Sequence, residues 1–279
     1  MARTPAQSKS SSKLLQKSAE KSQNKPQNNR QNVTTKKLKP TVTTASPAKS
    51  PTAATKDSPV TKAKAKSTQK LPIAEVFERF REKTPEPKGE LEHVNAYTLL
   101  VAVVLSAQAT DAGVNKATRA LFKVADTPEK MVGLGEDTVR EYVKTIGLYR
   151  NKAKNVILLS QKLIAEHGSV VPASRDALTA LPGVGRKTAN VVLNMAFGQK
   201  TMAVDTHVFR VAHRLGLSDG KNPEAVEDDL MRAIPDEYLF HAHHWLILHG
   251  RYTCLARKPR CGLCPISDLC TSADKVDDA

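Results

Sequence analysis

Apolar side chains from residue 71 onward recur at every third or fourth position, the spacing of one face of a helix. Examples of this spacing are Val156, Leu159 and Leu163, and again Val226, Leu230 and Ala233. Helix punctuation agrees: Asn222 and Pro223 fit an N-cap followed by proline at the first helical position, and Gly168 and Gly198 stand where helices should end. Because no segment alternates convincingly between apolar and polar positions, we predict an all-α fold of roughly ten short helices.

Two segments, 97–107 and 239–248, are apolar almost all round, which is typical of helices buried on every side. The second of them holds Trp245, the single tryptophan of the chain. We expect these two helices to form the centres of two separate hydrophobic cores.

Residues 1–70 differ from the rest of the chain in composition. They contain no Phe, Tyr or Trp and are rich in Lys, Ser, Thr, Gln, Asn and Pro, so they lack the apolar side chains that would offset the entropy of ordering. They hold 14 Lys and 2 Arg against Glu20 and Asp57, a net charge of +14, which leaves only +1 for residues 71–279. We predict a disordered basic tail in this segment.

A flexible cationic tail attracts polyanions through counterion release, and this favours nucleic acid as a partner. Two other roles stay open, namely a solubilising extension without a specific partner and an organellar targeting peptide. The tail is rich in lysine, with arginine only at Arg3 and Arg30, and it lacks an obvious amphipathic helix, which argues against targeting.

No stretch of the sequence approaches the ~18 uninterrupted apolar residues of a membrane span, and none resembles the apolar centre of a signal peptide. We therefore expect a protein with no membrane partner in a reducing compartment. In such a compartment cysteines serve as metal ligands more often than they form disulfides.

All four cysteines fall near the end of the chain, as Cys254, Cys261, Cys264 and Cys270, with the spacing C-x6-C-x2-C-x5-C. Four thiolates in one short segment can converge on a [4Fe–4S] cluster or on a tetrahedral Zn²⁺, and the spacing alone does not choose between the two. We expect a structural rather than a redox role, in which the metal holds the basic loop 257–260 where it can meet phosphates.

The sequence LPGVGRKTAN at 181–190 joins two apolar helical segments and resembles a helix-hairpin-helix motif over about residues 174–198. Gly183 and Gly185 permit positive φ and close backbone approach, and the second helix presents unpaired N–H groups, so the turn should cradle a phosphate. A nucleotide P-loop is excluded, because Arg186 stands before Lys187 where that motif requires glycine.

Lys187 lies in the first turn of the second helix, next to Arg186 and at the positive end of the helix dipole. Both neighbours disfavour the ammonium form, and a lowered pKa is what an amine nucleophile needs for Schiff-base chemistry near neutral pH. The competing interpretation is a second cation that binds phosphate.

Asp205, in the sequence VDTH at 204–207, stands directly before a predicted helix. Its plainest role is an N-cap, because aspartate is favoured there for backbone hydrogen bonding alone. The functional interpretation is a carboxylate that stabilises positive charge on a sugar ring or assists proton transfer.

The hairpin, the VDTH sequence and the cysteine pattern follow one another in the order typical of the endonuclease III family, which this chain resembles over about residues 71–275. Three further motifs match the family: LSAQATD (105–111), KTIGLY (144–149) and HHWLILHGR (243–251). Residues 1–70 have no counterpart in the family pattern.

The resemblance implies a two-domain helical fold with a DNA-binding cleft between a six-helix domain and an iron–sulfur domain. It places the six-helix domain, with the hairpin, at 91–199 and the iron–sulfur cluster domain at 71–90 plus 200–279. It also favours a [4Fe–4S] cluster over zinc, held in a loop near the end of the chain.

The resemblance implies catalytic roles for Lys187, which would attack C1′ of the damaged nucleotide, and for Asp205, which would assist displacement of the base. Gln108 and Leu148 would be the wedge residues that fill the space left by the extruded base. Gly183, Gly185 and Arg186 would complete the DNA-binding set.

We therefore predict a bifunctional DNA glycosylase and abasic-site lyase of base-excision repair, acting on oxidised pyrimidines in double-stranded DNA. We expect a monomer in a bacterial cytoplasm, associated with the nucleoid, with an organelle as an open alternative. Two alternative functions are a monofunctional glycosylase and a non-catalytic protein. A monofunctional adenine glycosylase relative would lack Lys187, and a non-catalytic iron–sulfur DNA-binding protein would not need Lys187 and Asp205 together.

Overall fold

The computed structural model describes residues 71–276, so the predicted basic tail at 1–70 lies outside the described residues. The described part contains ten α-helices, one short 3₁₀ helix and no strand, which confirms the predicted all-α fold. The α-helices are α1 (Ile73–Lys83), α2 (Ala96–Ser106), α3 (Asp111–Val124), α4 (Pro128–Val143), α5 (Tyr149–His167), α6 (Arg175–Thr179), α7 (Arg186–Phe197), α8 (Thr206–Arg214), α9 (Pro223–Ala233) and α10 (Asp236–Tyr252). The 3₁₀ helix η1 is Cys261–Leu263.

The helix ends follow from local side-chain chemistry. Asn222 caps α9, where its side chain accepts a hydrogen bond from the backbone N–H of Ala225 at 2.8 Å, and Pro223 is the first helical residue. Gly168 and Gly198 end α5 and α7 in the left-handed conformation. All of these boundaries were predicted. Within residues 71–276, no helix combines the length and apolarity needed to cross a membrane.

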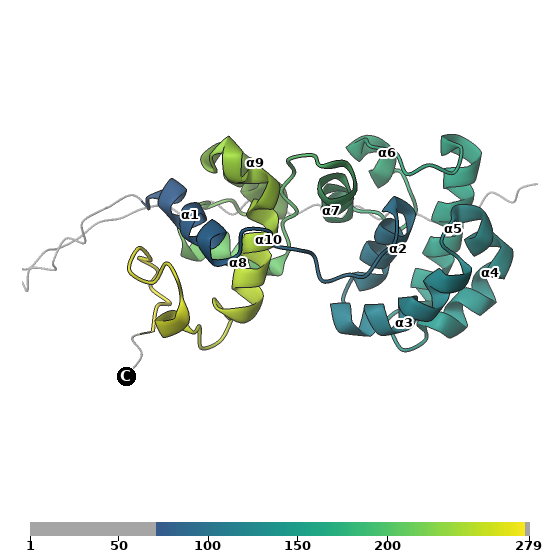
Figure 1. Ribbon diagram of the computed structural model, residues 1–279, viewed down its shortest axis with the longest axis horizontal. Coiled ribbons are helices and arrows are strands. Elements are labelled where there is room, and N and C mark those ends of the chain that lie inside the picture. The colour runs from purple at the N-terminus through teal and green to yellow at the C-terminus, as the bar shows by residue number, and fades with distance from the viewer. Residues whose placement is uncertain (1–70, 277–279) are drawn as a thin grey trace, which may run out of the picture. The chain divides into compact units, whose positions relative to one another are not determined.

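The first hydrophobic core is built around α2, which is buried on all sides as predicted. This helix packs against α3, α5 and α7, and α4 packs along α5. The side chains of this cluster come from residues 97–193. The α2–α7 helices occupy the right half of Figure 1, with α7 nearest to the other half.

The second core is built around α10, which packs against α8 and α1. Phe77 of α1 lies 6.2 Å from Trp245 of α10 between ring centroids, and the indole Nε1 of Trp245 donates to the carbonyl of Thr84 at 2.8 Å. Figure 1 shows α1, from the start of the described chain, lying beside α10 from near its end. The side chains of this cluster come from 76–80 and from 202–266.

This partition of buried side chains supports the predicted domain boundaries, which stay a prediction. Six helices, α2–α7, supply the first core, and both ends of the described chain contribute to the second. The position of a side chain on α7 or α8 near the junction therefore depends on how the two cores pack against each other.

Candidate active site and cysteine pocket

The hairpin between α6 and α7 depends on one glycine in a left-handed conformation. Gly183 has φ of 77°, and a Cβ at this position would lie 2.9 Å from the side-chain nitrogen of Asn155 on α5. A side chain at residue 183 would therefore meet both backbone strain and a steric clash. The predicted need for glycine is confirmed at this position.

Gly185 corrects the sequence-based expectation. Its φ of −95° and ψ of 174° are extended backbone that any residue adopts, and nothing lies within 4 Å of a Cβ placed there. The positive φ that glycine permits is not used at Gly185, because the single left-handed residue at 183 already turns the chain into α7. Gly185 is the N-cap of α7 and makes no side-chain cap, so the first turn of α7 has no capping side chain over its N–H groups.

Lys187 lies in a pocket that both cores line. The pocket includes Asp205, Asp111 and Arg251 together with Gln108. Burial lowers the pKa of Lys187, the nearby charges of Asp205 and Asp111 oppose this shift, and Arg251 adds to it. The lowered pKa predicted from the sequence is confirmed, and removal of the amine from water is its main cause.

Arg186, which we expected to repel the Lys187 ammonium, is engaged elsewhere. Its guanidinium pairs with both carboxylate oxygens of Glu227 on α9, with Nε–Oε2 at 2.7 Å and Nη2–Oε1 at 3.0 Å. Arg186 is absent from the groups that shift the Lys187 pKa. The direction of the shift was predicted correctly, and the contribution expected from Arg186 was wrong. The role of Arg186 in DNA binding stays a prediction.

Asp205 caps α8 with one of its two carboxylate oxygens, as predicted. Oδ1 accepts hydrogen bonds from the backbone N–H groups of His207 and Val208 at 2.8 and 2.9 Å. The other oxygen, Oδ2, lies 3.4 Å from Nδ1 of His207. The start of α8 thus holds Oδ1 in place, and Asp205 is one of the residues that line the pocket.

Sequence reasoning did not single out two charged residues of this pocket, Asp111 and Arg251. The Arg251 guanidinium Nη1 lies 2.5 Å from Oδ2 of Asp111, and it also pairs with Glu90 in the segment that connects α1 to α2. Both residues belong to motifs on which the family resemblance rests, and these motifs are the sequence signal that could have identified them. Their pairing joins α10 to α3 at the pocket wall.

The two predicted wedge residues share an unusual backbone conformation. Gln108 has φ of 54° and Leu148 has φ of 59°, which are left-handed values that cost a non-glycine residue about 1–2 kcal/mol. Gln108 is exposed, and the Leu148 side chain is 60% exposed although it is apolar. A Cβ at Gly147 would lie 3.9 Å from the Gln108 carbonyl, so the two loop tips are neighbours.

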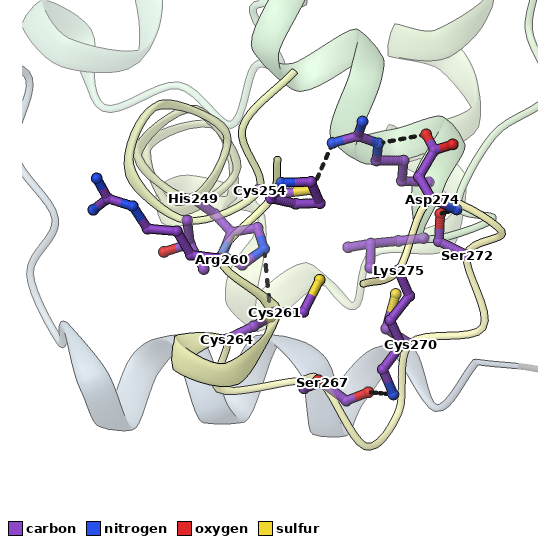
Figure 2. Close-up of a pocket in the computed structure, with 14 residues that line it drawn as sticks. His249, Cys254, Arg260, Cys261, Cys264, Ser267, Cys270, Ser272, Asp274 and Lys275 are labelled. Atoms are coloured by element: carbon purple, nitrogen blue, oxygen red, sulfur yellow. Dashed lines mark hydrogen bonds and ion pairs between the residues drawn. The ribbon is translucent and has the colours of Figure 1, made fainter. Parts of the chain in front are cut away.

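The four cysteines are free thiols that line a single pocket between α8, α10 and the last described loop (Figure 2). Polar hydrogens point at the sulfurs: Arg214 Nη1 lies 3.4 Å from the sulfur of Cys254, and the backbone N–H of Val276 lies 3.5 Å from that of Cys261. Within residues 71–276, no three histidine, cysteine or carboxylate side chains lie close enough together to hold a single metal ion. The donor set and its N–H partners suit an anionic thiolate-bound cluster.

The chain is similar to known proteins along nearly all of its described length. Residues 101–236 match the family described as HhH-GPD superfamily base excision DNA repair protein, and residues 254–270 match the iron–sulfur binding domain of endonuclease III. Endonuclease III of Haemophilus influenzae is 55% identical over 203 residues, which are 73% of this chain and 96% of that protein. Endonuclease III of Escherichia coli K12 is 57% identical, with the same coverage.

The chain belongs to the endonuclease III family. A solved structure of a trapped covalent intermediate between an endonuclease III and DNA superposes with a TM-score of 0.67 at 45% identity, covering 71% of this chain and 93% of that one. A non-covalent endonuclease III–DNA complex gives a TM-score of 0.66, covering 70% of this chain and 92% of that one. The protein is therefore a DNA-binding enzyme of base-excision repair, a bifunctional glycosylase and abasic-site lyase, and the non-catalytic alternative is set aside.

Membership of the endonuclease III family also decides the choice left open between iron–sulfur and zinc. The match to the iron–sulfur binding domain begins at Cys254 and ends at Cys270, so the cofactor is a [4Fe–4S] cluster. Individual cysteines keep their predicted roles as ligands, and the cluster would fix the loop that follows α10.

Loss of one cysteine should unfold the second core rather than only the loop. We expect Cys264→Ala to remove the cluster iron and to lower the free energy of unfolding by more than about 4 kcal/mol, the scale of losing a structural metal site. The measurements are iron per chain and urea unfolding. The control is Leu263→Ala, since this neighbour is 71% exposed and should change neither quantity. Full iron content and unchanged unfolding in Cys264→Ala would remove Cys264 from the ligand set.

Proposed function

We propose that this protein excises oxidised pyrimidines from double-stranded DNA and then cuts the strand, with Lys187 as nucleophile and Asp205 as its partner. The observation that supports this most directly is a single pocket lined by an amine whose pKa is lowered by burial and by a carboxylate whose charge acts on that amine. A free amine and a nearby negative charge are what displacement at a sugar carbon requires.

In the proposed reaction, the lone pair of the Lys187 Nζ forms a bond to C1′ while the bond from C1′ to the base breaks. The electrons of the broken bond leave with the base, which takes up a proton, and Nζ gives up one of its own protons once it is bonded to C1′. Oδ2 of Asp205 stabilises the positive charge that develops on the sugar ring. The C1′–O4′ bond then breaks, O4′ takes up a proton, and the bond between Nζ and C1′ becomes the double bond of a Schiff base. Loss of a proton from C2′ expels the 3′ phosphate, which nicks the strand.

The reaction requires the damaged nucleotide to leave the base stack. Gln108 and Leu148 would occupy the vacated space, since both side chains are exposed on neighbouring loop tips next to the pocket. The N–H groups at the start of α7, with Gly183 and Gly185 allowing close approach, would hold a phosphate of the same strand. Arg186 would join them, with Nε and Nη2 of its guanidinium paired with Glu227.

We also propose that the protein acts as a monomer in a bacterial cytoplasm, where it works on nucleoid DNA. The bacterial origin of similar proteins, among them those of Haemophilus influenzae and Escherichia coli, supports this compartment. The pocket draws all the residues of the proposed reaction from one chain, which supports a monomer.

Single-turnover assays on three duplexes test the proposed substrate class. The duplexes are identical except for one thymine glycol, one abasic site or no lesion. We expect nicking of the first two and none of the third, with release of the free damaged base from the first. Nicking of the abasic duplex alone would contradict the assignment of oxidised pyrimidines while keeping the lyase activity.

The tail at 1–70, which carries a net charge of +14, should increase non-specific affinity for DNA. We expect deletion of residues 1–68 to reduce the dependence of duplex affinity on salt, because each phosphate that loses a cation partner lowers the slope by ~0.9. The plateau rate of cleavage should not change. A tail of the same length with its lysines and arginines replaced by glutamine is the matched control and should behave like the deletion. An unchanged slope would contradict this role.

A further inference from the structure

Glu227 on α9 is an unusual residue because its carboxylate is buried and shared by two arginines. It is 5% exposed, and no other aspartate or glutamate within residues 71–276 is buried. Besides the two contacts to Arg186 at 2.7 and 3.0 Å, its Oε1 lies 3.4 Å from Nη2 of Arg175. A carboxylate removed from water in this way is stable only with its cation partners in place.

The two arginines occupy equivalent positions in the hairpin. Arg175 is the first residue of α6, and Arg186 is the first residue of α7. A cation at the start of a helix is disfavoured by the helix dipole, so both positions call for a nearby negative charge. Glu227 supplies this charge to both helices of the hairpin at once.

This ion triad crosses the junction between the two cores. Val226 and Leu230, on either side of Glu227, are buried in the second core, whereas α7 belongs to the first. Lys187 follows Arg186 directly, and Asp205 is the cap of α8 in the second core. The distance between the proposed nucleophile and its carboxylate therefore depends on how α7 is held against α9.

We propose that Glu227 is a positioning residue for Lys187. It fixes the start of α7, through the two-point contact with Arg186, against the core that carries Asp205. This inference rests on the proposed role of Lys187. Planar arginine–carboxylate pairs of this kind restrict orientation as well as distance, which a single contact would not do.

The test is single-turnover borohydride trapping on a duplex with one abasic site, in which the plateau rate and the protein concentration at half-saturation are measured separately. We expect Glu227→Gln to lower the plateau rate by about tenfold or more, the scale of displacing a reacting group by a fraction of an ångström. Half-saturation should stay within about twofold, because no DNA contact is lost. Asp228→Asn removes the same charge from an exposed neighbour on α9 and should match the wild type.

A double-mutant cycle separates positioning through Arg186 from a general effect on the fold. Arg186→Met should lower the plateau rate as much as Glu227→Gln does, and the two changes together should lower it no further. If Glu227→Gln does not fold, Arg186→Lys replaces it in the test. This variant keeps the positive charge but loses the two-point contact, and it should show the same lowered plateau rate. The inference is overturned if these variants have the same plateau rate as Asp228→Asn. It is also overturned if only the protein concentration at half-saturation changes.

Lys187→Gln is included in the same series so that the two claims can fail separately. Trapping that persists in Lys187→Gln would contradict the proposed nucleophile. Trapping that requires Lys187 but proceeds at the wild-type rate in Glu227→Gln would contradict only the role of Glu227.

Discussion

Lys187→Gln is expected to abolish base excision and strand cleavage together, lowering the single-turnover rate by at least about a thousandfold. The amide nitrogen of glutamine cannot form a bond to C1′, so neither the displacement nor the Schiff base can occur. The same variant should keep its affinity for duplex DNA, because its side chain is of similar length and the hairpin backbone is unchanged. Cleavage and binding are measured on the thymine glycol duplex, and residual base release near the wild-type rate would contradict the nucleophile.

The same substitution should leave the fold intact or make it more stable. The pKa of Lys187 in the folded protein lies below that of a lysine in the unfolded chain, because burial disfavours the ammonium. The unfolded chain therefore holds more protons between the two pKa values, and stability rises with pH through that window. At pH values below that window Lys187 is charged in the folded protein, and the full free-energy cost of burying this charge is present. Glutamine carries no charge and removes that cost. Thermal unfolding at neutral pH should show an equal or higher melting temperature.

For the wild-type protein the lowered pKa also fixes the direction of the pH dependence. Only the free amine is a nucleophile, so the trapping rate should rise with pH through the pKa of Lys187 and level off above it. This rise should come below the range of an ordinary lysine, because the pKa is lowered.

Asp205→Asn is expected to lower the rate of base excision by about 10²- to 10³-fold with little change in stability. Asparagine caps a helix about as well as aspartate, so the hydrogen bonds to the N–H groups of His207 and Val208 can be kept. The negative charge of this pocket residue is lost. Since Asp205 raises the pKa of Lys187, the variant should also shift the rise in trapping rate to lower pH.

A comparison with Asp205→Ala separates the two roles of this residue. Alanine removes both the cap and the charge, so it should add a loss of about 1 kcal/mol of stability to a similar loss of rate. If Asp205→Asn excises bases at the wild-type rate, Asp205 is only the cap of α8.

Features governed by neighbouring residues were predictable from the sequence. The cap of α9 at Asn222, the left-handed ends at Gly168 and Gly198, and the left-handed turn at Gly183 all follow from local conformational preferences. The two buried helices were predictable because their residues are apolar in every direction. The roles of Lys187 and Asp205 needed the family resemblance, since their local positions also suit a phosphate-binding cation and a cap.

Features governed by distant residues were not predictable. Arg186 and Glu227 are 41 residues apart, and Arg251 and Asp111 are 140 apart, so neither pairing leaves a periodic signal in the sequence. The expectation that Arg186 would depress the Lys187 pKa failed for this reason. The left-handed conformation at Leu148 was also not predictable. The sequence would place it at the neighbouring Gly147, because glycine accepts that conformation without cost.

The most direct test of Lys187 as nucleophile is to locate the covalent bond itself. Borohydride-trapped protein on the thymine glycol duplex is digested with nuclease and protease, and mass spectrometry identifies the lysine that carries the nucleotide remnant. Lys152 is the informative comparison, because burial lowers the pKa of this lysine as well. It is 6% exposed and lies outside the Lys187 pocket. We expect the remnant on Lys187. A remnant on Lys152 or on any other lysine would contradict the account.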